Sequence, residues 1–440
     1  MASDRDFSWL AVRGRRAPRG RAGLYAALVW LGLASAALPA HAQPADPVIY
    51  SYDGAVLFDG AYGPVAAMQK AAKAALQSCN SPATIVADGR LGKQTKLALA
   101  ALANCVGYDD LGAVAKTGVM TQAYWRRLMA TDPPSIDERA RTLMLTFEAT
   151  DYTAAEWNFC QSRPLYDPTA ARPVCYSNDP HSYLTWGPNG ATAGGGREIQ
   201  AIVQRLDTDN PDRIDAAFGP QAADVRRMSR LRNDSTRSLE TYLCAIWSDP
   251  VRRAAWRVGF AELGRDPAVR IAFDSLYRSV SYDGGKITTF EAAYAAFNLK
   301  PTEVDYAFFK DRAAHTSPNG AAIRAAIRAQ VAANADTAGW RIRRAISLNV
   351  RPSNQRKDRL GRDVAFYVDG LGTAALSTEE RAAWTARGMC RASSVGLTDD
   401  RPGPDFTAGP TFSPVAPTEI LTDAEKQACP AAVLNTQKPT

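Results

Sequence analysis

The chain has 440 residues, of which 46% are hydrophobic and 22% charged, so it is long enough for two or three ordinary globular domains. Its formal net charge is +7, but residues 1–42 hold six arginines against two aspartates and account for +4 of it. The remainder therefore lacks the concentrated basic character of a nucleic-acid-binding protein, and we expect no nucleic-acid partner.

Residues 1–42 have the pattern of a signal peptide. A basic region ends near Arg21, an apolar stretch runs from Leu24 to Leu38, and Ala40-His41-Ala42 is a small-x-small cleavage site. The alternative is a membrane anchor, for which the apolar stretch is short. No later segment reaches about 18 uninterrupted apolar residues. We therefore expect a periplasmic or secreted protein that is not an integral membrane protein after cleavage.

All seven cysteines follow the signal peptide, and in an oxidising compartment they tend to pair. The pairs closest in sequence are Cys79–Cys105, Cys160–Cys175 and Cys390–Cys429, which leaves Cys244 as a buried free thiol. No C-x-x-C spacing is present, so we expect no zinc site. After residue 42 only His181 and His315 remain, which makes carboxylates the natural carriers of catalysis.

Residues 43–132 form the first predicted domain. Helical periodicity covers residues 63–78 and 96–102, and a D-G-x-x-G-x-x-T-x-x-A-L run extends from Asp88 to Leu99. This region resembles the small three-helix peptidoglycan-binding-like domain of cell-wall hydrolases. The resemblance implies either wall binding or a purely structural module, because the Gly and Thr of the run are structural residues.

A second region starts after the spacer at residues 131–135. Ser135 caps a predicted helix over residues 136–148, a segment bracketed by Cys160 and Cys175 follows, and a Gly/Thr-rich hairpin covers residues 185–197. Most of residues 198–348 is predicted to be helical, with Asp283-Gly284-Gly285 as a break before a helix at residues 290–298. Residues 351–362 are predicted to form a basic loop, residues 378–386 a helix, and the chain after Gly396 an extended or disordered tail.

The hairpin sequence TWGPNGATAGGGR, from Thr185 to Arg197, resembles the T-x-G-x-x-G-x-T-x-G-x-G signature of the chitosanase family within the lysozyme-like superfamily. The resemblance implies a mainly α protein. Residues 133–390 would be a two-lobed lysozyme-like α+β catalytic domain with a small β-hairpin at the cleft, followed by a Pro-rich C-terminal tail at residues 391–440. It also implies an inverting glycoside hydrolase. We expect no metal or organic cofactor, because acid–base hydrolysis of an acetal needs none.

The resemblance assigns roles to three residues. The general acid of the family ends the helix before the hairpin, which is the position of Glu148. The base lies a few residues before the first Thr; Asp179 is the nearest carboxylate, one residue out of register because Pro180 occupies the matching position. Thr185 would position the attacking water. Leu145 and Phe147, with Trp157 as a wall, would keep Glu148 protonated.

Further residues follow from the same resemblance. Arg359 or Arg362 would pair with the catalytic carboxylates. The residues expected to contact the sugar are Trp157, Trp186, His181, Asn189 and Thr192.

Several other interpretations of these residues stay open. Glu148 is also compatible with an ordinary helix end, Asp151 with a second carboxylate or a cap, and Asp179 with the start of a turn. The tryptophans are compatible with core positions, and His315 with a helix end. The sequence thus predicts an exported hydrolase of β-1,4-linked amino-sugar polymers, either peptidoglycan or chitosan. The alternative is a non-catalytic cell-wall-binding protein.

Overall fold

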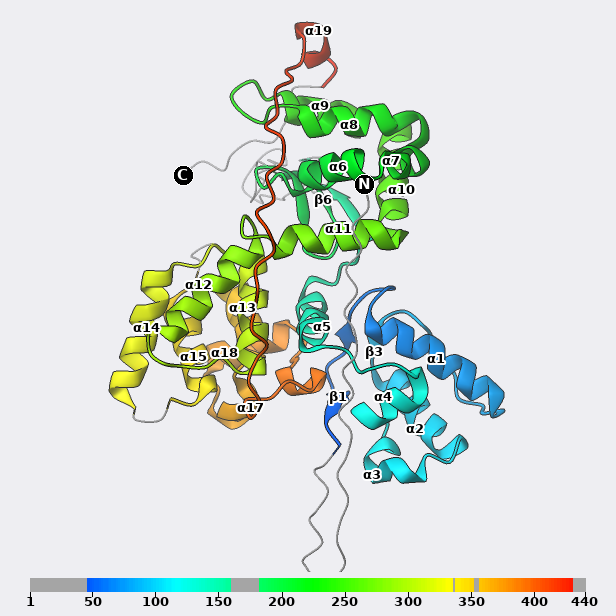
Figure 1. Cartoon of the computed structure of the whole chain (residues 1–440), viewed down its shortest axis with the longest axis vertical. Helices are drawn as coiled ribbons and strands as arrows, with labels where there is room; N and C mark the ends of the chain where they lie inside the picture. Colours follow the sequence, from blue (N-terminus) through cyan, green and yellow to red (C-terminus); the bar gives the residue numbers. More distant parts are fainter. Residues whose placement is uncertain (1–45, 160–181, 335–336, 352–355, 430–440) are drawn as a thin grey trace, which may run out of the picture. The chain divides into compact units, whose positions relative to one another are not determined.

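The computed structural model describes residues 46–159, 182–334, 337–351 and 356–429 (Figure 1). These residues are mainly helical, as predicted, and contain three small antiparallel sheets. The predicted signal peptide, the pair Cys160–Cys175, Asp179 and His181 lie outside the described residues.

The N-terminal region consists of short strands and helices. Strand β1 (Val48–Tyr50) pairs with β4 (Met120–Thr121), and β2 (Leu57–Phe58) pairs with β3 (Arg90–Leu91). The helices are α1 (Pro64–Ser78), α2 (Lys93–Cys105), α3 (Gly112–Ala115) and α4 (Gln122–Met129).

The Asp-Gly turn of the N-terminal region is held from inside. The Gln69 side chain donates to Asp88 Oδ1 at 3.2 Å and accepts from the Gly89 amide at 2.8 Å. Gly89 has φ +71°, and a Cβ there would lie 2.1 Å from the carbonyl oxygen of Gly60. The glycine of the motif is therefore required by the fold.

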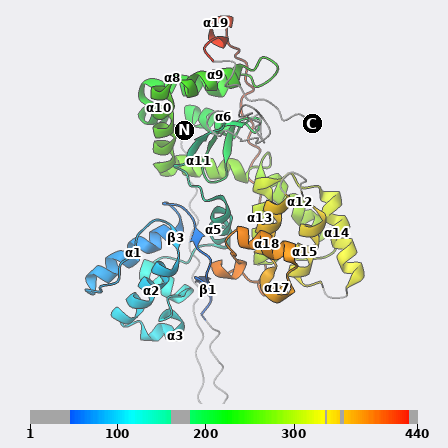
Figure 2. The same cartoon turned by 180° about the vertical axis from the view of Figure 1, so that it is seen from behind.

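The core of the N-terminal region continues past residue 132. Helix α5 (Ile136–Glu148) begins with the Ser135–Glu138 capping box. Leu99 of α2, Phe147 of α5 and Phe308 belong to one hydrophobic cluster, the first core, so the predicted domain boundary is not a break in packing. Figure 2 shows α5 between the N-terminal strands and α13. The other helices of this part are α12 (Asp283–Ala295), α13 (Glu303–His315), α14 (Gly320–Ala333), α15 (Gly339–Asn349), α16 (Arg356–Val364), α17 (Val368–Leu371) and α18 (Thr378–Ala386).

A second core lies around a three-stranded sheet. Strand β6 (Ser182–Trp186) is central, between β5 (Ala155–Trp157) and β7 (Ala191–Gly194). The predicted hairpin is confirmed: β6 and β7 are joined by a turn in which Gly187 and Gly190 have φ +80° and +65°. The surrounding helices are α6 (Glu198–Asp209), α7 (Pro211–Phe218), α8 (Ala222–Arg230), α9 (Ser238–Ser248), α10 (Pro250–Arg265) and α11 (Pro267–Arg278).

Two local predictions were wrong. Residues 356–362 of the predicted basic loop lie in helix α16, because Arg359 and Arg362 pair with a buried acidic residue instead of facing water. The break predicted at Asp283-Gly284-Gly285 is the first turn of α12. The glycines there permit close approach, since a Cβ on Gly284 would lie 2.3 Å from the carbonyl oxygen of Arg278.

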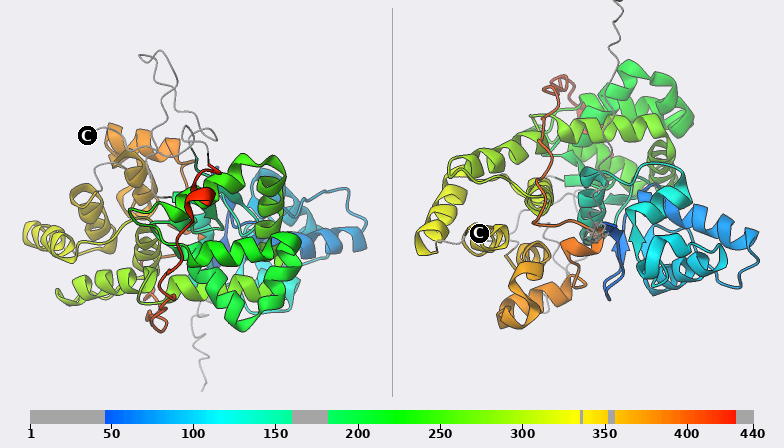
Figure 3. Two further views of the ribbon diagram at one scale, coloured as in Figure 1. Left: turned by 90° about the horizontal axis from the view of Figure 1, so that it is seen from above. Right: turned by 60° about the horizontal axis from the view of Figure 1, so that its bottom comes forward.

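The C-terminal strap, residues 398–429, is extended and contacts both cores. Near the first core Gly403 donates its amide to Pro301 at 2.9 Å, and Arg401 pairs with Glu303 at 2.7 Å. At the second core the amide of Arg232 donates to the carbonyl of Glu419 at 2.9 Å. The strap ends beside α9 after a short helix, α19 (Asp423–Lys426) (Figures 1 and 3).

The strap also changes the disulfide pattern. Cys79–Cys105 is confirmed, but Cys429 bonds to Cys244 of α9 instead of Cys390. Among the described cysteines Cys390 is the buried free thiol, because the strap carries Cys429 away from the first core, where Cys390 packs. The two disulfides agree with an oxidising compartment. None of the described helices is long and apolar enough to cross a membrane.

Replacing Cys429 with Ser should destabilise the protein more than replacing Cys79 with Ser. The Cys244–Cys429 bond closes a sequence separation of 185 residues, against 26 for Cys79–Cys105. Loop-closure entropy then gives about 5 kcal/mol for the long loop and about 3.5 kcal/mol for the short one. Urea denaturation measures both; a smaller loss for Cys429→Ser than for Cys79→Ser would contradict the expectation.

Candidate functional site

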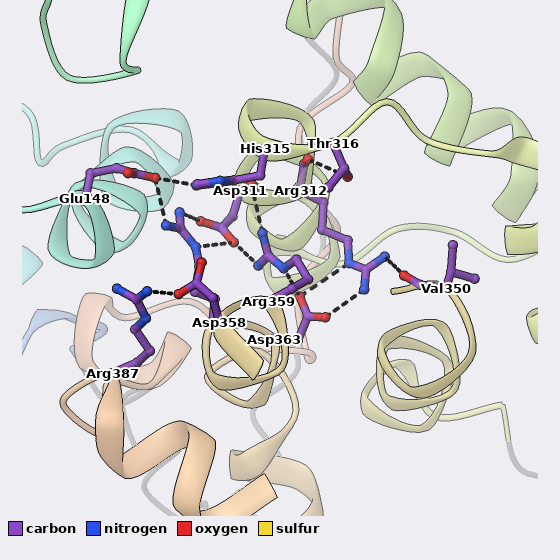
Figure 4. Close-up of polar contacts among 11 residues, drawn as sticks. Glu148, Asp311, Arg312, His315, Thr316, Val350, Asp358, Arg359, Asp363 and Arg387 are labelled. Carbon is purple, nitrogen blue, oxygen red and sulfur yellow. Dashed lines mark hydrogen bonds and ion pairs between the residues drawn. The ribbon is translucent and has the colours of Figure 1, made fainter. Parts of the chain in front are cut away.

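Glu148 is the last residue of α5 and lies at the meeting point of three helices. Ala149 follows it in the left-handed conformation, with φ 54°, and its amide caps the helix by donating to Leu145 at 2.8 Å. The Glu148 carboxylate accepts hydrogen bonds from His315 Nε2 at the end of α13 and, at 2.7 Å, from Arg362 Nη1 of α16 (Figure 4). Both contacts are made to Oε1.

A chain of alternating charges extends from Glu148 into the protein. Arg362 also binds the carboxylate of Asp311, which binds Arg359 in turn. Arg359 Nε donates to Asp363 at 2.8 Å. Arg312 Nη2 donates to the same Asp363 at 2.7 Å. Three positive and three negative side chains thus alternate, and all but Glu148 are almost completely buried. We call this set the buried ion network; its members are Glu148, Arg362, Asp311, Arg359, Asp363 and Arg312.

The network sets the charge of its carboxylates. Burial alone would raise the pKa of Glu148, but the hydrogen bond from His315 and the charge of Arg362 outweigh it and lower the pKa to about 2. Asp311 is more deeply buried, and Arg359 and Arg362 hold its pKa well below the usual range. The sequence-based expectation that apolar neighbours keep Glu148 protonated is therefore wrong for this structure.

Of the two arginines expected to pair with the predicted catalytic carboxylates, Arg362 contacts Glu148. His315 does end a helix, as its context indicated, but its contact with Glu148 was missed. The scarcity of histidine was the available signal, because only two histidines follow residue 42. The spacing of Asp311 and His315, one helical turn apart on α13, places both on the side that meets Glu148 and Arg362.

The hairpin residues are held by local hydrogen bonds. Thr185 pairs with Thr192 across β6 and β7, and its hydroxyl accepts from Asn158 at 2.7 Å. The hydroxyl of Thr192 donates to Glu198 at 2.8 Å. Asn189 lies in the turn, at the edge of a cavity of about 110 Å³ that α5, α11 and α12 also line.

The two predicted sugar-contacting tryptophans lie in the second core. Trp186 is completely buried; its ring packs against Phe260 and Phe273, and its indole nitrogen donates to the Tyr152 carbonyl at 2.7 Å. Trp157 is buried beside Trp256. Neither ring presents a face for a sugar, so the core interpretation holds for both.

The candidates for a second carboxylate are Asp179, Asp151 and Asp283. Asp179, with His181, is outside the described residues. Asp151 caps its own turn by accepting from the Thr153 amide at 2.8 Å, as the alternative interpretation indicated. In the cavity beside Asn189, Asp283 is almost completely buried; burial raises its pKa although Lys286 lies 3.0 Å away.

A larger cavity of about 480 Å³ adjoins His315, and we call it the basic pocket. It is formed by α12, the end of α13, the start of α14 and the end of α15. The residues that line it are Phe290, Arg312, His315, Thr316, Ser317, Pro318, Asn319, Ala322, Ile323, Asn349, Val350 and Arg351.

The described part of the chain contains no group of three or more His, Cys, Asp or Glu side chains placed to hold a metal ion. Comparisons of the chain with protein-family models, with curated proteins and with solved structures found no match. The geometry of the site therefore carries the functional argument.

Replacing Asp311 with Asn should destabilise the fold by about 3–5 kcal/mol, because it leaves Arg359 and Arg362 buried without their shared carboxylate. Asp209→Asn is the matched control, since Asp209 pairs with Arg205 on an exposed helix face and should change stability by less than about 1 kcal/mol. Chemical denaturation compares the two. Equal losses would show that the network is not energetically distinct from a surface ion pair.

The stability difference between wild type and Glu148→Gln should depend on pH. The folded-state pKa of Glu148 is lowered to about 2, so its contribution is complete above the unfolded value near 4.5 and is lost as pH falls toward 2. The difference at pH 6 should be about 3 kcal/mol and should shrink steadily below pH 4.5. Denaturation between pH 2 and 7 measures it. Asp423→Asn is the matched control, because solvent screens this exposed side chain of α19 and its replacement should change stability little.

Proposed function

We propose that the chain is an exported glycoside hydrolase that cleaves β-1,4-linked amino-sugar polymers, with Glu148 as the general acid. The supporting observation is the contact between Arg362 and Glu148. The family resemblance implied an arginine on the catalytic carboxylate, and an arginine 214 residues away in sequence donates to Glu148 at 2.7 Å. The proposed partner is a polysaccharide, and peptidoglycan is favoured over chitosan for an exported protein.

The anchoring of Glu148 leaves one oxygen for chemistry. His315 and Arg362 both contact Oε1, so the carboxylate is oriented while Oε2 takes part in neither contact. A fixed orientation is what proton transfer to a glycosidic oxygen requires. A quarter of the Glu148 side chain is exposed, which allows a substrate to reach it.

The acid role requires a proton that Glu148 alone does not hold at neutral pH. We propose that Glu148 takes this proton from solvent at Oε2, the oxygen that neither His315 nor Arg362 contacts, as the substrate binds. A bound polysaccharide excludes water from the carboxylate, and this desolvation raises the pKa of Glu148 and favours the protonated acid.

The remaining steps follow the inverting scheme. Glu148 protonates the leaving oxygen, the bond from that oxygen to the anomeric carbon breaks, and water attacks the carbon from the opposite face. A second carboxylate takes the proton of that water. Asp179 stays the proposed base and Thr185 the proposed water-positioning residue. The hydroxyl of Thr185, which accepts from Asn158, has its own proton left to donate to that water.

A second candidate function is a non-catalytic cell-wall-binding protein. One observation favours it: Glu148 is ionised and bound by two neighbours, as a purely structural carboxylate would be. Under this alternative the buried ion network serves stability alone.

Glu148→Gln should lower the rate of clearing of purified sacculi, or of chitosan hydrolysis, by about a hundredfold or more, because glutamine cannot donate the proton. Glu138→Gln is the matched control on the same helix, since glutamine also completes a capping box and activity should stay unchanged. Turbidity and reducing-end assays measure both polymers.

The two candidate functions predict different results in this assay. Hydrolysis that survives Glu148→Gln would refute the assignment of the acid. Wild-type protein that binds sacculi without clearing them would support the non-catalytic alternative.

A further inference from the structure

The basic pocket has an unusual lining for a site beside a catalytic carboxylate. Its charged and titratable lining residues are Arg312, His315 and Arg351, and no Asp or Glu is among its described lining residues. A glycan site for glucosamine units needs carboxylates to pair with their ammonium groups. The basic pocket instead presents positively charged arginines.

Arg351 is the arginine of the pocket whose positive charge is least neutralised by a carboxylate. Its side chain is 8% exposed, and its nearest acidic partner, Glu379, lies 3.4 Å away with half of its own side chain in water. An ion pair with an exposed partner is weak and is screened by solvent. Arg351 therefore retains a positive field that a ligand can use. Arg312, in contrast, is paired with the buried Asp363.

The rest of the lining suits a sugar. Asn319, Asn349, Thr316 and Ser317 supply amide and hydroxyl groups. Phe290 and Ile323, which belong to the first core, close the apolar side of the pocket. In Figure 4 the His315 side chain extends toward Glu148, while Arg312 extends away from Glu148 toward Val350. His315, Arg312 and Thr316 all line the basic pocket. The pocket and the proposed acid are thus joined through one residue.

We propose that the basic pocket binds the carboxylate of an anionic glycan and thereby selects against the ammonium groups of chitosan. The proposal rests on the proposed function, since it places this carboxylate on the substrate of that same site. Arg351 makes the charged contact and is the specificity-determining residue. Two sources carry this chemistry: the lactyl carboxylate of muramic acid that bears no stem peptide, and the ring carboxylate of a uronic acid.

Direct binding to the full chain after signal-peptide cleavage tests the proposal without turnover. Isothermal titration at low salt compares N-acetylmuramic acid, glucuronic acid, N-acetylglucosamine and glucosamine. At least one of the two carboxylate sugars should bind about tenfold or more tightly than N-acetylglucosamine, and glucosamine should bind most weakly. Raising the salt to about 0.5 M should reduce the advantage of the carboxylate. The tighter of the two carboxylate sugars identifies the source.

Variants locate the binding in the pocket. Arg351→Gln should lower the preference for the carboxylate sugar over N-acetylglucosamine by about tenfold, and Arg351→Lys should keep part of it. Arg328→Gln is the control; Arg328 is exposed on α14 outside the pocket lining, so its replacement should leave the preference unchanged. Thermal denaturation verifies that each variant is folded. Equal binding of glucosamine, or a preference that survives Arg351→Gln, would overturn the proposal. Carboxylate binding that persists in a protein with no hydrolytic activity would instead overturn only the proposed enzyme.

Discussion

The carboxylate of Asp311 lies between two guanidinium groups in a part of the protein that water does not reach, and the arrangement around Glu148 depends on this contact. The members of the buried ion network come from three helices: Glu148 from α5, Asp311 and Arg312 from α13, and Arg359, Arg362 and Asp363 from α16. Their charges balance only when all three helices are docked. Because an unpaired buried charge is costly, the buried ion network penalises any other arrangement of these helices. The position of Glu148 is a consequence of that constraint.

The parts of the fold that sequence could predict are those with local causes. The cap at Ser135, the hairpin turn with its glycines and the pair Cys79–Cys105 each depend on residues close in the chain. Helix α16 could not be predicted in this way. Its arginines indicated a solvated loop because their partner, Asp311, is 48 to 51 residues away. The same holds for Cys244, whose partner lies 185 residues further on.

The candidate site shows the same division. The position of Glu148 at a helix end followed from helix periodicity, and the pairing with Arg362 followed from the resemblance. The ionisation of Glu148 could not be predicted from the sequence. Its sequence neighbours Leu145 and Phe147 are apolar, whereas its spatial neighbours are a histidine and an arginine. The tryptophans illustrate the converse error, since a large aromatic residue near a cleft motif is as suitable for a core as for a sugar.

The C-terminal strap has a consequence for the order of events in the life of the chain. Biosynthesis proceeds from the N-terminus, so Cys244 is made 185 residues before its partner and α9 stays without its covalent closure until residue 429 has been added. The second core therefore gains this covalent closure only after Cys429 has joined the chain.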